Sequence, residues 1–564
     1  MAKLYKYSIN LLILITVIIS TIFFFNFNKG LELSDESYLL LISMYPNDII
    51  GRANNSGVIG NILLQLANNN LYFFRILGGL LLILSSFVLI NPISNFLKNK
   101  LYIKNFANNY ILLTLLLGSL NYYHNWVITP SYDLYNLIGI LLFLSGILKI
   151  VECPIKNLNF LISILLVVLG GLISFISKPT SAFFLIFIYF IWIVYFLNFK
   201  ELLFRSLFII ILSIVSFYLY ILFYFENIYL YLNDLKIGIE LKVLLDPRYS
   251  LIDNFISIIK QILFYYYSNI FLISFVLIFL LLSKFFLKSK FKNIAFILTF
   301  LPLFFIDNLL LSLLFIVLIY LITIIDSSTI SKLSKTKKNN LFYIFILIFL
   351  LYSYLVGTNT NAVVLLKKAS LIIFLIFLCI ILNLESSKKL LFRKVNIFFI
   401  ILIFFTLKNL FYNFEKPRRL HDNIYNQTKA IKLKNFNGEI YIDEITFNFI
   451  NELNQILQNN QWKNGDYMID FTGREPGLNV ITGAKFVIEP WWGSGYIGSE
   501  KKAKKLLSIA DLKIIKNSWI ISTNHKININ PKILNNLKLS LQKDYKLIGT
   551  IKKKDKSYFI WKPE

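Results

Sequence analysis

Two adjacent carboxylates near the start of the chain are the first side chains that could carry out chemistry. Asp35 and Glu36 lie in a short polar run that also contains Tyr38. A carboxylate held near a hydroxyl group can remove its proton as a general base. An isolated Asp-Glu pair is more often a solvated surface feature. The elements around the pair must therefore decide between these two interpretations.

The composition of the chain places these carboxylates in a membrane protein. Hydrophobic residues make up 57% of the 564 residues, and the mean hydropathy is +0.67. Soluble domains are nearer ~45–50% apolar. Many segments hold about 20 apolar residues with few charges, which is the length that crosses a bilayer. The sequence therefore predicts a polytopic α-helical membrane protein.

The formal net charge of the chain is +27. A basic excess can indicate a nucleic-acid partner, but in a membrane protein it is typical of inner loops that obey the positive-inside rule. We therefore expect membrane lipids, and no nucleic acid, as partners. Cys153 lies in a predicted inner loop and Cys379 in a hydrophobic segment, so no disulfide is expected.

Residues 1–412 are predicted to form the membrane domain, with about thirteen spans by the length criterion. The first runs from about Tyr7 to Asn28 and is interpreted as an uncleaved span with a cytoplasmic N-terminus. Nearly every second connection is rich in Lys, including residues 98–104, 284–292 and 332–338. An odd number of spans places the C-terminus on the extracytoplasmic side of the inner or plasma membrane.

The other connections form the predicted outer side. Residues 35–44 and 58–67 carry apolar residues at helical spacing and can lie flat at the membrane interface. Residues 226–254 are expected to form a large outer loop between spans seven and eight. Catalytic and binding residues of an outer-face enzyme should lie on these connections.

From about Asn413 the composition changes to that of a soluble domain, which we place at 413–564. Alternating strands and helices predict a small extracytoplasmic α/β domain. Strands are expected at 439–445, 466–471 and 518–523, helices at 446–459, 499–511 and 532–542, and a terminal hairpin at 546–561.

The direction of each carboxylate in the first loop follows from helix geometry. Residues that are adjacent at a helix start point about 100° apart, so Asp35 and Glu36 cannot both face one point of a cavity. We expect Asp35 to be the base, with Tyr38 on the same face as an aromatic wall beside a sugar. Glu36 is expected to support Asp35 from another side or to meet a cation such as Arg52.

Other candidate residues lie on later outer connections. Asp133, next to Tyr132, is the one acidic residue between predicted spans three and four. Outer cations are informative because the positive-inside rule predicts few of them. Lys178 at a hairpin turn, Arg248 in the large loop and Arg52 could hold a phosphate. Snorkelling of these side chains to lipid headgroups is the alternative.

Two glycine-containing loops of the soluble domain, 472–477 and 490–496, do not fit a dinucleotide or P-loop spacing, so we reject nucleotide binding. Trp491 and Trp492 in the second loop could contact the face of a sugar or lie at the level of the headgroups. Ordinary packing in the domain is the alternative for both side chains.

The first-loop motif of Asp35, Glu36 and Tyr38, with Asp133 and Lys178, resembles that of the GT-C glycosyltransferases. This superfamily includes aminoarabinose transferases, protein mannosyltransferases and oligosaccharyltransferases. The resemblance covers the architecture of about the first eight spans. The chain also looks like a group of bacterial membrane proteins without a settled function, which supports a shared fold and not a substrate.

The resemblance implies transfer of a sugar from a polyprenyl-phosphate-linked donor to a glycan, lipid or protein acceptor at the outer membrane face. Asp35, Glu36 and Asp133 would be the catalytic residues. Oligosaccharyltransferase subunits have a metal-binding Asp-x-Asp where this chain has Ser131-Tyr132-Asp133, so no metal or other cofactor is expected. A transporter, a flippase or a polymerase of lipid-linked sugars, or a non-enzymatic assembly subunit, remains the alternative.

Overall fold

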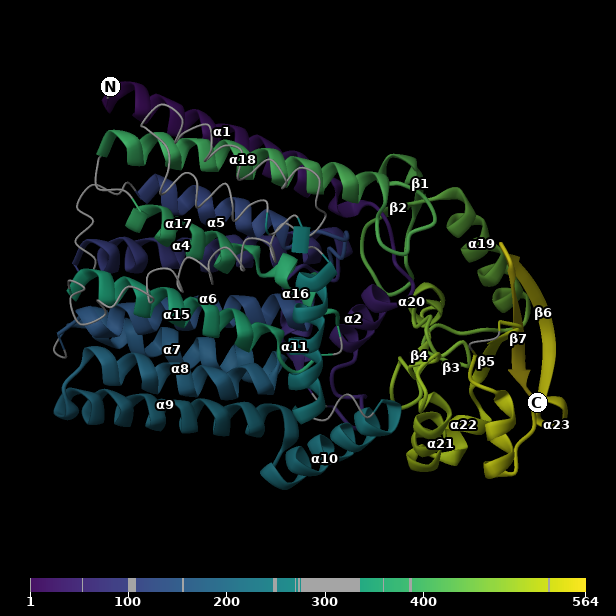
Figure 1. Cartoon of the computed structure of the whole chain (residues 1–564). Coiled ribbons are helices and arrows are strands. Elements are labelled where there is room, and N and C mark those ends of the chain that lie inside the picture. The colour runs from purple at the N-terminus through teal and green to yellow at the C-terminus, as the bar shows by residue number, and fades with distance from the viewer. Residues whose placement is uncertain are drawn as a thin grey trace.

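The structure is a computed structural model of the whole chain (Figure 1). It describes residues 2–99 apart from 53, 108–154, 157–246, 251–268 with 270, 271 and 274, 335–384 apart from 359, and 388–564 apart from 526 and 527. Some predicted features lie outside the described residues. They are Arg248, the Lys-rich connections at 284–292 and 332–334, and the two spans predicted between these connections.

Long helices run side by side in the membrane domain, and the N-terminus lies at the end of this bundle opposite the C-terminal domain (Figure 1). Among the described residues, eight helices are long and apolar enough to cross a membrane, or nine if a bent pair counts as one span. The predicted total of thirteen is therefore not confirmed. The bundle helices are α1 (Ala2–Phe25), α4 (Leu71–Asn99), α5 (Asn108–Asn121), α6 (Tyr132–Glu152), α7 (Leu158–Ser177), α8 (Pro179–Phe196), α9 (Phe199–Phe225), α15 (Lys335–Leu355), α17 (Ser370–Leu384) and α18 (Lys388–Glu415).

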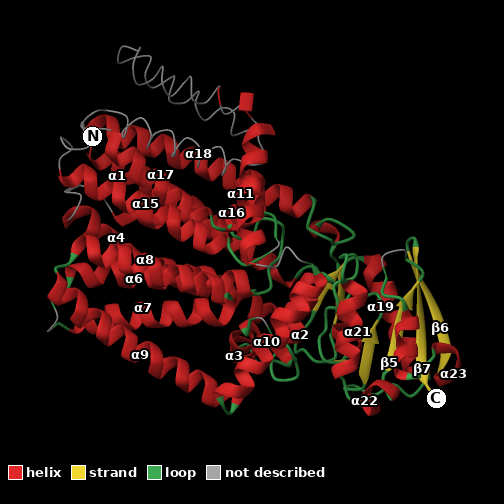
Figure 2. Cartoon of the chain, turned by 60° about the horizontal axis from the view of Figure 1, so that its bottom comes forward, coloured by secondary structure: helices red, strands yellow, loops and turns green. Residues whose placement is uncertain are grey.

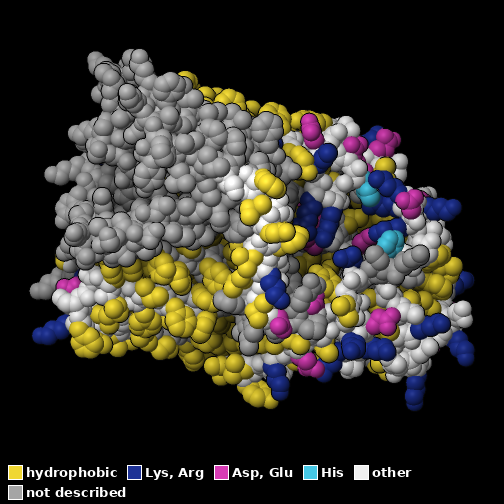
Figure 3. Space-filling view, viewed as in Figure 1, with side chains coloured by type: hydrophobic (Ala, Val, Ile, Leu, Met, Phe, Trp, Pro, Cys, Tyr) yellow, Lys and Arg dark blue, Asp and Glu magenta, His cyan; other side chains and the backbone are white. Residues whose placement is uncertain are grey.

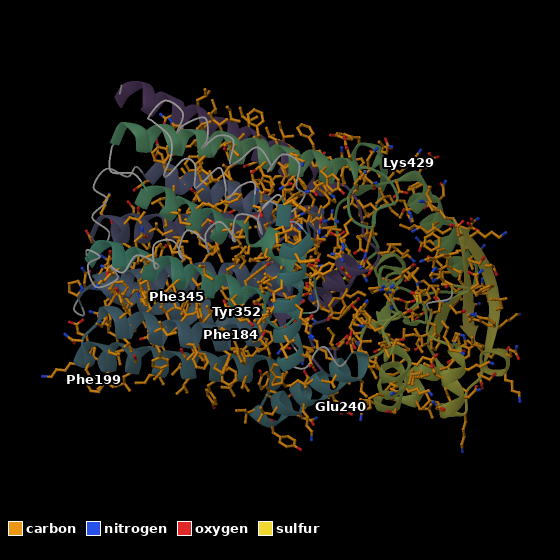
Figure 4. The ribbon with its side chains drawn as sticks, in the orientation of Figure 1. Phe184, Phe199, Glu240, Phe345, Tyr352 and Lys429 are labelled. Carbon is orange, nitrogen blue, oxygen red and sulfur yellow. The ribbon has the colours of Figure 1, made fainter. Side chains whose placement is uncertain are left out.

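Helix α6 lies at the centre of the bundle, and small residues allow α7 to approach it closely. A Cβ added to Gly170 would lie 2.5 Å from the carbonyl oxygen of Gly139, and one added to Gly146 would lie 2.8 Å from that of Ser163. Small residues serve membrane helices in this way because dispersion contacts replace the hydrophobic effect inside lipid. Elsewhere aromatic rings fill the contacts, as between Phe184 of α8 and Tyr352 of α15 (Figure 4).

The bent pair consists of α16 (Ala362–Lys368) and the start of α17, which meet at 71°. A turn that includes Gly357 comes before α16. Helix α16 is therefore a short segment at the end of the bundle that carries the C-terminal domain (Figure 1). Lys367 and Lys368 lie at its C-terminal end, where a helix dipole favours cations.

The first outer connection contains the two short helices that its periodicity predicts, α2 (Asp35–Met44) and α3 (Ser56–Leu66). Helix α2 lies between the bundle and the C-terminal domain (Figure 1). The expectation of a large loop at 226–254 is wrong, because α10 (Ile228–Leu245) fills most of it and α11 (Leu251–Ser268) begins before it ends.

Among the residues that the structure describes, the strands all lie in the C-terminal domain, as Figure 2 shows. Its main sheet has the order β4-β3-β5-β7-β6, in which β4, β3 and β5 are parallel and the terminal hairpin is antiparallel. The predicted helix at 532–542 is instead a 3-10 helix, η6, followed by the short α23. The elements are β1 (Lys429–Ile431), β2 (Ile440–Ile442), α19 (Glu444–Asn459), β3 (Tyr467–Asp470), α20 (Gly477–Thr482), β4 (Lys485–Phe486), α21 (Ser499–Ile509), α22 (Leu512–Lys516), β5 (Trp519–Thr523), η6 (Pro531–Leu537), α23 (Leu541–Asp544), β6 (Tyr545–Lys553) and β7 (Lys556–Pro563).

The C-terminal domain packs directly on the first connection and on α10. The N–H of Gly477 donates to the carbonyl of Leu33 at 2.8 Å, and the N–H of Gly30 donates to that of Tyr441 at 2.7 Å. Glu240 of α10, labelled in Figure 4, lies 3.1 Å from Lys505 of α21. Apolar side chains of α2 and α3 share one core cluster with those of the domain. These contacts place the first-loop carboxylates at the junction of the two parts.

Candidate active site

The start of α2 separates the two adjacent carboxylates, as its geometry predicts. Glu36 points into the protein, where its carboxylate lies 2.8 Å from the guanidinium of Arg75 on α4. The Thr129 hydroxyl also donates to Glu36. Arg75 donates to the carbonyls of Phe27 at 2.7 Å and Gly30 at 2.8 Å as well. Glu36 and Arg75 therefore form a buried anchor that holds the first connection onto the bundle.

The expected partner of Glu36, Arg52, lies elsewhere. Its Nε is 2.9 Å from Asp234 of α10, and the N–H of Gly51 donates to the same carboxylate at 2.6 Å. The Arg52 guanidinium also lies 4.7 Å from the centre of the Phe225 ring. Arg52 thus ties the first connection to α10, and it still lines a cavity described below.

Asp35 points the other way, and 40% of its side chain is exposed. Two arginines hold its carboxylate: Arg418 Nη2 lies 3.0 Å from Oδ2, and Arg419 Nη1 lies 2.7 Å from Oδ1. Both follow α18 almost directly along the chain. Sequence reasoning missed them, although four residues containing three cations, Lys416 to Arg419, follow the last span on the side where few cations are expected.

Glu32 is a third carboxylate in this region, and sequence reasoning also missed it. Its two oxygens accept hydrogen bonds from the N–H of Ser34 at 2.9 Å and of Glu36 at 2.8 Å, so it caps the start of α2. Arg419 Nη1 lies 3.6 Å from it. Burial, together with the charge of Asp35, raises the pKa of Glu32 to about 7.

Asp133, at the start of α6, is buried and lies 2.6 Å from Lys368 of α16. Its other oxygen has no hydrogen-bond partner among the described residues. The neighbouring Tyr132 is partly exposed. The bend between α16 and α17 brings Lys368 to this position. The sequence singles out Asp133 but gives no sign of its partner, because Lys368 lies at the start of a segment that resembles an ordinary span.

Lys178 lies between α7 and α8, as predicted, but its side chain points inward. Its Nζ donates to the carbonyl of Tyr354 at 2.6 Å, and the side chain is buried. Burial lowers its pKa to about 8, while Asp133 raises it and Lys368 and Lys242 lower it. Lys178 therefore does not reach lipid headgroups, and it lies near the Asp133–Lys368 pair.

His124 connects the two groups of charges. It lies in the turn before α6 and is buried. Burial lowers its pKa well below the usual value, and Lys367, Lys368 and Arg418 lower it further. Arg418, which contacts Asp35, and Lys368, which contacts Asp133, thus both lower the pKa of one imidazole. With Lys367 and Lys178 they form a basic region at this end of the bundle.

Figure 3 shows a hollow on this face between the bundle and the C-terminal domain, with Lys, Arg and His side chains gathered around it. A small pocket lies among α2, α3, α10 and the domain. Tyr38 and Arg52 line it, together with Lys242, Glu489 and Lys502. Two residues that the sequence predicts to contact substrate therefore lie on one cavity.

The C-terminal domain contributes the wall of this cavity through Lys502. Its Nζ lies 2.8 Å from the Glu489 carboxylate and donates to the carbonyl of Trp491 at 3.0 Å. The Trp491 ring is partly exposed and packs against Tyr496. Trp492 is buried in the domain core against Phe471, with its Nε1 donating to the Glu489 carbonyl at 2.8 Å. Trp492 therefore packs within the domain, which is the alternative that the sequence left open for this side chain.

The residues that the structure describes contain no group of three or more His, Cys, Asp or Glu side chains that could hold a metal ion. The candidate site instead pairs each carboxylate with cations: Asp35 with two arginines, Glu36 with Arg75 and Asp133 with Lys368. Such a site can bind an anion and hold a base beside it.

No family model and no curated protein matches the sequence. Two solved structures resemble the chain, both of ArnT from Cupriavidus metallidurans. The apo structure has a TM-score of 0.42 at 9% identity, and the structure bound to undecaprenyl phosphate has a TM-score of 0.43 at 10% identity. Each comparison covers 97% of both chains. These values are too low to assign a function, so the proposals below rest on the residues of this chain.

Proposed function

We propose that the chain is a membrane glycosyltransferase of the GT-C type, which transfers a sugar from a polyprenyl-phosphate-linked donor to an acceptor at the outer face of the membrane. The observation that carries the proposal is the position of Asp35. It is an accessible carboxylate at the end of a membrane bundle, in contact with Arg418 and Arg419.

The chemistry of this transfer needs a base and a group of cations. The base removes the proton from the acceptor hydroxyl as it attacks the sugar carbon. The bond from that carbon to the phosphate oxygen breaks, and cations stabilise the charge on the departing phosphate. Asp35 is the base in this proposal. The basic region of Arg418, Lys367, Lys368 and Lys178 supplies the cations.

Glu36 has a supporting role in the proposal because its carboxylate is fully engaged with Arg75 and Thr129. It fixes the start of α2 and thereby the direction of Asp35. Asp133 is engaged with Lys368 and is proposed to set the position of that lysine. Residues that act through others in this way are positioning residues, whereas Asp35 would touch the substrate.

The C-terminal domain is proposed to help bind the acceptor. It closes over α2 and lines the cavity beside Tyr38 with Glu489 and Lys502. Trp491 lies next to that wall and offers an aromatic surface to a sugar. A glycan, lipid or protein acceptor would enter between this domain and the basic region.

A transporter or flippase of lipid-linked sugars is the second candidate. Such a protein should carry ionisable side chains near the middle of the membrane, on its translocation path. The described charges instead gather at the two ends of the helices. This distribution favours surface chemistry over translocation, and no specific observation favours a polymerase.

The test is transfer by the purified full chain in liposomes, supplied with a panel of polyprenyl-phosphate sugars. Release of free polyprenyl phosphate is measured by mass spectrometry. Asp35→Asn keeps the shape of the side chain and should lower the rate by about 10²–10⁴, the usual contribution of a general base. Asp48→Asn, an exposed carboxylate of the same connection, is the matched control and should keep the normal rate. Normal turnover in Asp35→Asn would refute the assignment.

A further inference from the structure

Arg418 and Arg419 lie just beyond the end of the last membrane helix that the structure describes. They follow α18, whose span ends at Glu415, so their backbone leaves the membrane domain at this level. The N–H of Arg418 donates to the carbonyl of Asn125 at 3.3 Å, which ties the segment to the turn before α6. This hydrogen bond holds the backbone from which the two arginine side chains extend at the end of the bundle.

Both arginines remain partly open although they contact carboxylates. The exposed fractions of the side chains are 35% for Arg418 and 40% for Arg419. Arg419 is shared among Asp35, Glu32 and the Ser34 hydroxyl, whereas Arg418 contacts Asp35 through one nitrogen. A guanidinium has five N–H donors in a planar fork that matches the oxygens of a phosphate.

The surroundings of Arg418 favour a further anion. Its charge and those of Lys367 and Lys368 act together on His124. Of these cations, Lys368 already has Asp133, and the carboxylate that Arg418 contacts is Asp35. Asp35 therefore occupies a position that a phosphate oxygen could take, with the same charge sign and a similar hydrogen-bond geometry.

We propose that Arg418 and Arg419 bind the phosphate group of the lipid-linked donor, and that Asp35 occupies these arginines until the phosphate displaces it. The inference rests on the proposed function for the identity of the ligand. It adds two binding residues and an order of events: the phosphate binds, the arginines turn to it, and Asp35 becomes free to accept a proton.

The exchange explains how a carboxylate between two arginines can act as a base. Both oxygens of Asp35 contact guanidinium groups, one on Arg418 and one on Arg419. When the phosphate takes the arginines, these oxygens are released and can accept the proton of the acceptor hydroxyl.

The decisive experiment measures binding of polyprenyl phosphate, without any sugar, to the full chain in phosphatidylcholine nanodiscs. Asp35→Asn should bind it about tenfold more tightly, because the competing charge is gone. Arg418→Gln should bind it at least about tenfold more weakly, the usual loss for a charge-assisted hydrogen bond. The double variant should bind more weakly than Asp35→Asn but more tightly than Arg418→Gln, because removal of Asp35 still frees Arg419.

Matched controls separate a specific site from general charge. Asp48→Asn and Lys416→Gln make the same charge changes nearby and should leave the affinity unchanged. Equal or weaker binding by Asp35→Asn would overturn the proposal, and so would unchanged binding by Arg418→Gln. If Arg418→Gln does not fold, Arg418→Lys takes its place. The proposal is then decided by whether Asp35→Asn binds polyprenyl phosphate more tightly or more weakly than the natural protein.

Two further arms identify the source of the phosphate. Inorganic phosphate and nanodiscs that contain phosphatidylglycerol are tested as competitors of polyprenyl phosphate. Equal competition by either would show a general anion site and overturn the assignment to the donor. Because no transfer is measured, tighter binding by Asp35→Asn in a protein without transferase activity would keep this inference and refute the proposed function.

Discussion

The Lys368 ammonium lies 2.6 Å from the Asp133 carboxylate, and this contact joins the short helix α16 to the first turn of α6. Both side chains are buried. The contact spans 235 residues of sequence and closes the end of the bundle at which the candidate site lies. The contribution of this contact to the stability of the protein can be measured separately from any effect on catalysis.

Breaking the Asp133–Lys368 pair should destabilise the protein strongly. Asp133→Asn leaves the buried Lys368 charge without its counter-ion, and losses of about 3–5 kcal/mol are usual in that case. Asp133→Asn/Lys368→Met should recover part of the loss because neither charge remains. Thermal unfolding in nanodiscs measures the loss in Asp133→Asn and the recovery in the double variant. The exposed Glu240–Lys505 pair between α10 and α21 is the control, and its loss should cost about 0–1 kcal/mol.

Glu32 should make the stability of the protein depend on pH. Its pKa rises from 4.5 to about 7 on folding. A carboxyl group shifted in this direction favours the folded state most below pH 4.5, and that contribution is lost as the pH rises through about 7. The uncharged Glu32→Gln should therefore gain unfolding free energy relative to the natural protein over this interval, on the order of 3 kcal/mol.

The measurement for Glu32 is chemical unfolding of both proteins at a series of pH values from 4.5 to 8. Glu452→Gln on the exposed face of α19 makes the same substitution in solvent and should show no such trend. The raised pKa of Glu32 would be contradicted if the unfolding free energies of the natural protein and of Glu32→Gln differed by the same amount at every pH in this range.

Gly477 should be indispensable for the contact between the domain and the first connection. A Cβ at this position would lie 2.6 Å from the Leu33 Cα, so the backbones would have to separate. Gly477→Ala should cost about 1–3 kcal/mol, the usual range for overpacking, and should release the C-terminal domain to limited proteolysis. Gly171→Ala in α7 meets nothing within 4 Å and should leave the proteolysis pattern unchanged.

The two ends of the bundle should lie on opposite sides of the membrane. Lys200 begins α9 at the end nearer the N-terminus, and Lys463 lies in the C-terminal domain. Single cysteines at these positions, in a chain without Cys153 and Cys379, should react with an impermeant maleimide from opposite sides of sealed vesicles. Reaction of both from the same side would contradict the positive-inside assignment.

Much of the fold follows from the sequence because membrane spans have a strong compositional signal. The turn at Lys178 is where Pro179 predicts it, since proline starts a helix readily but cannot continue one. The strands and helices of the C-terminal domain are placed correctly where their periodicity is regular. Residues 532–542 form a 3-10 helix and a short turn of α-helix instead, because Pro531 and the adjacent asparagines favour a tight local turn.

The candidate site was predictable in part. Asp35, Asp133 and Lys178 could be found because a charge next to a span is rare. Their partners could not be found, since Arg418 is 383 residues from Asp35 along the chain and no local rule joins them. Lys368 was hidden for another reason: a bend of 71° turns the start of an apparent span into the short helix α16. Spacing alone does not reveal such a bend.

The contact between Gly477 and Leu33 also has a consequence in time. The first connection leaves the ribosome about 440 residues before the loop that covers it. At roughly 5–20 residues per second, that interval is on the order of 20–90 seconds. Throughout it the apolar side of α2 has no cover from the C-terminal domain. Maturation of the protein is therefore limited by the arrival of its last segment, and an insertion-associated chaperone that shields α2 should raise the yield of assembled protein.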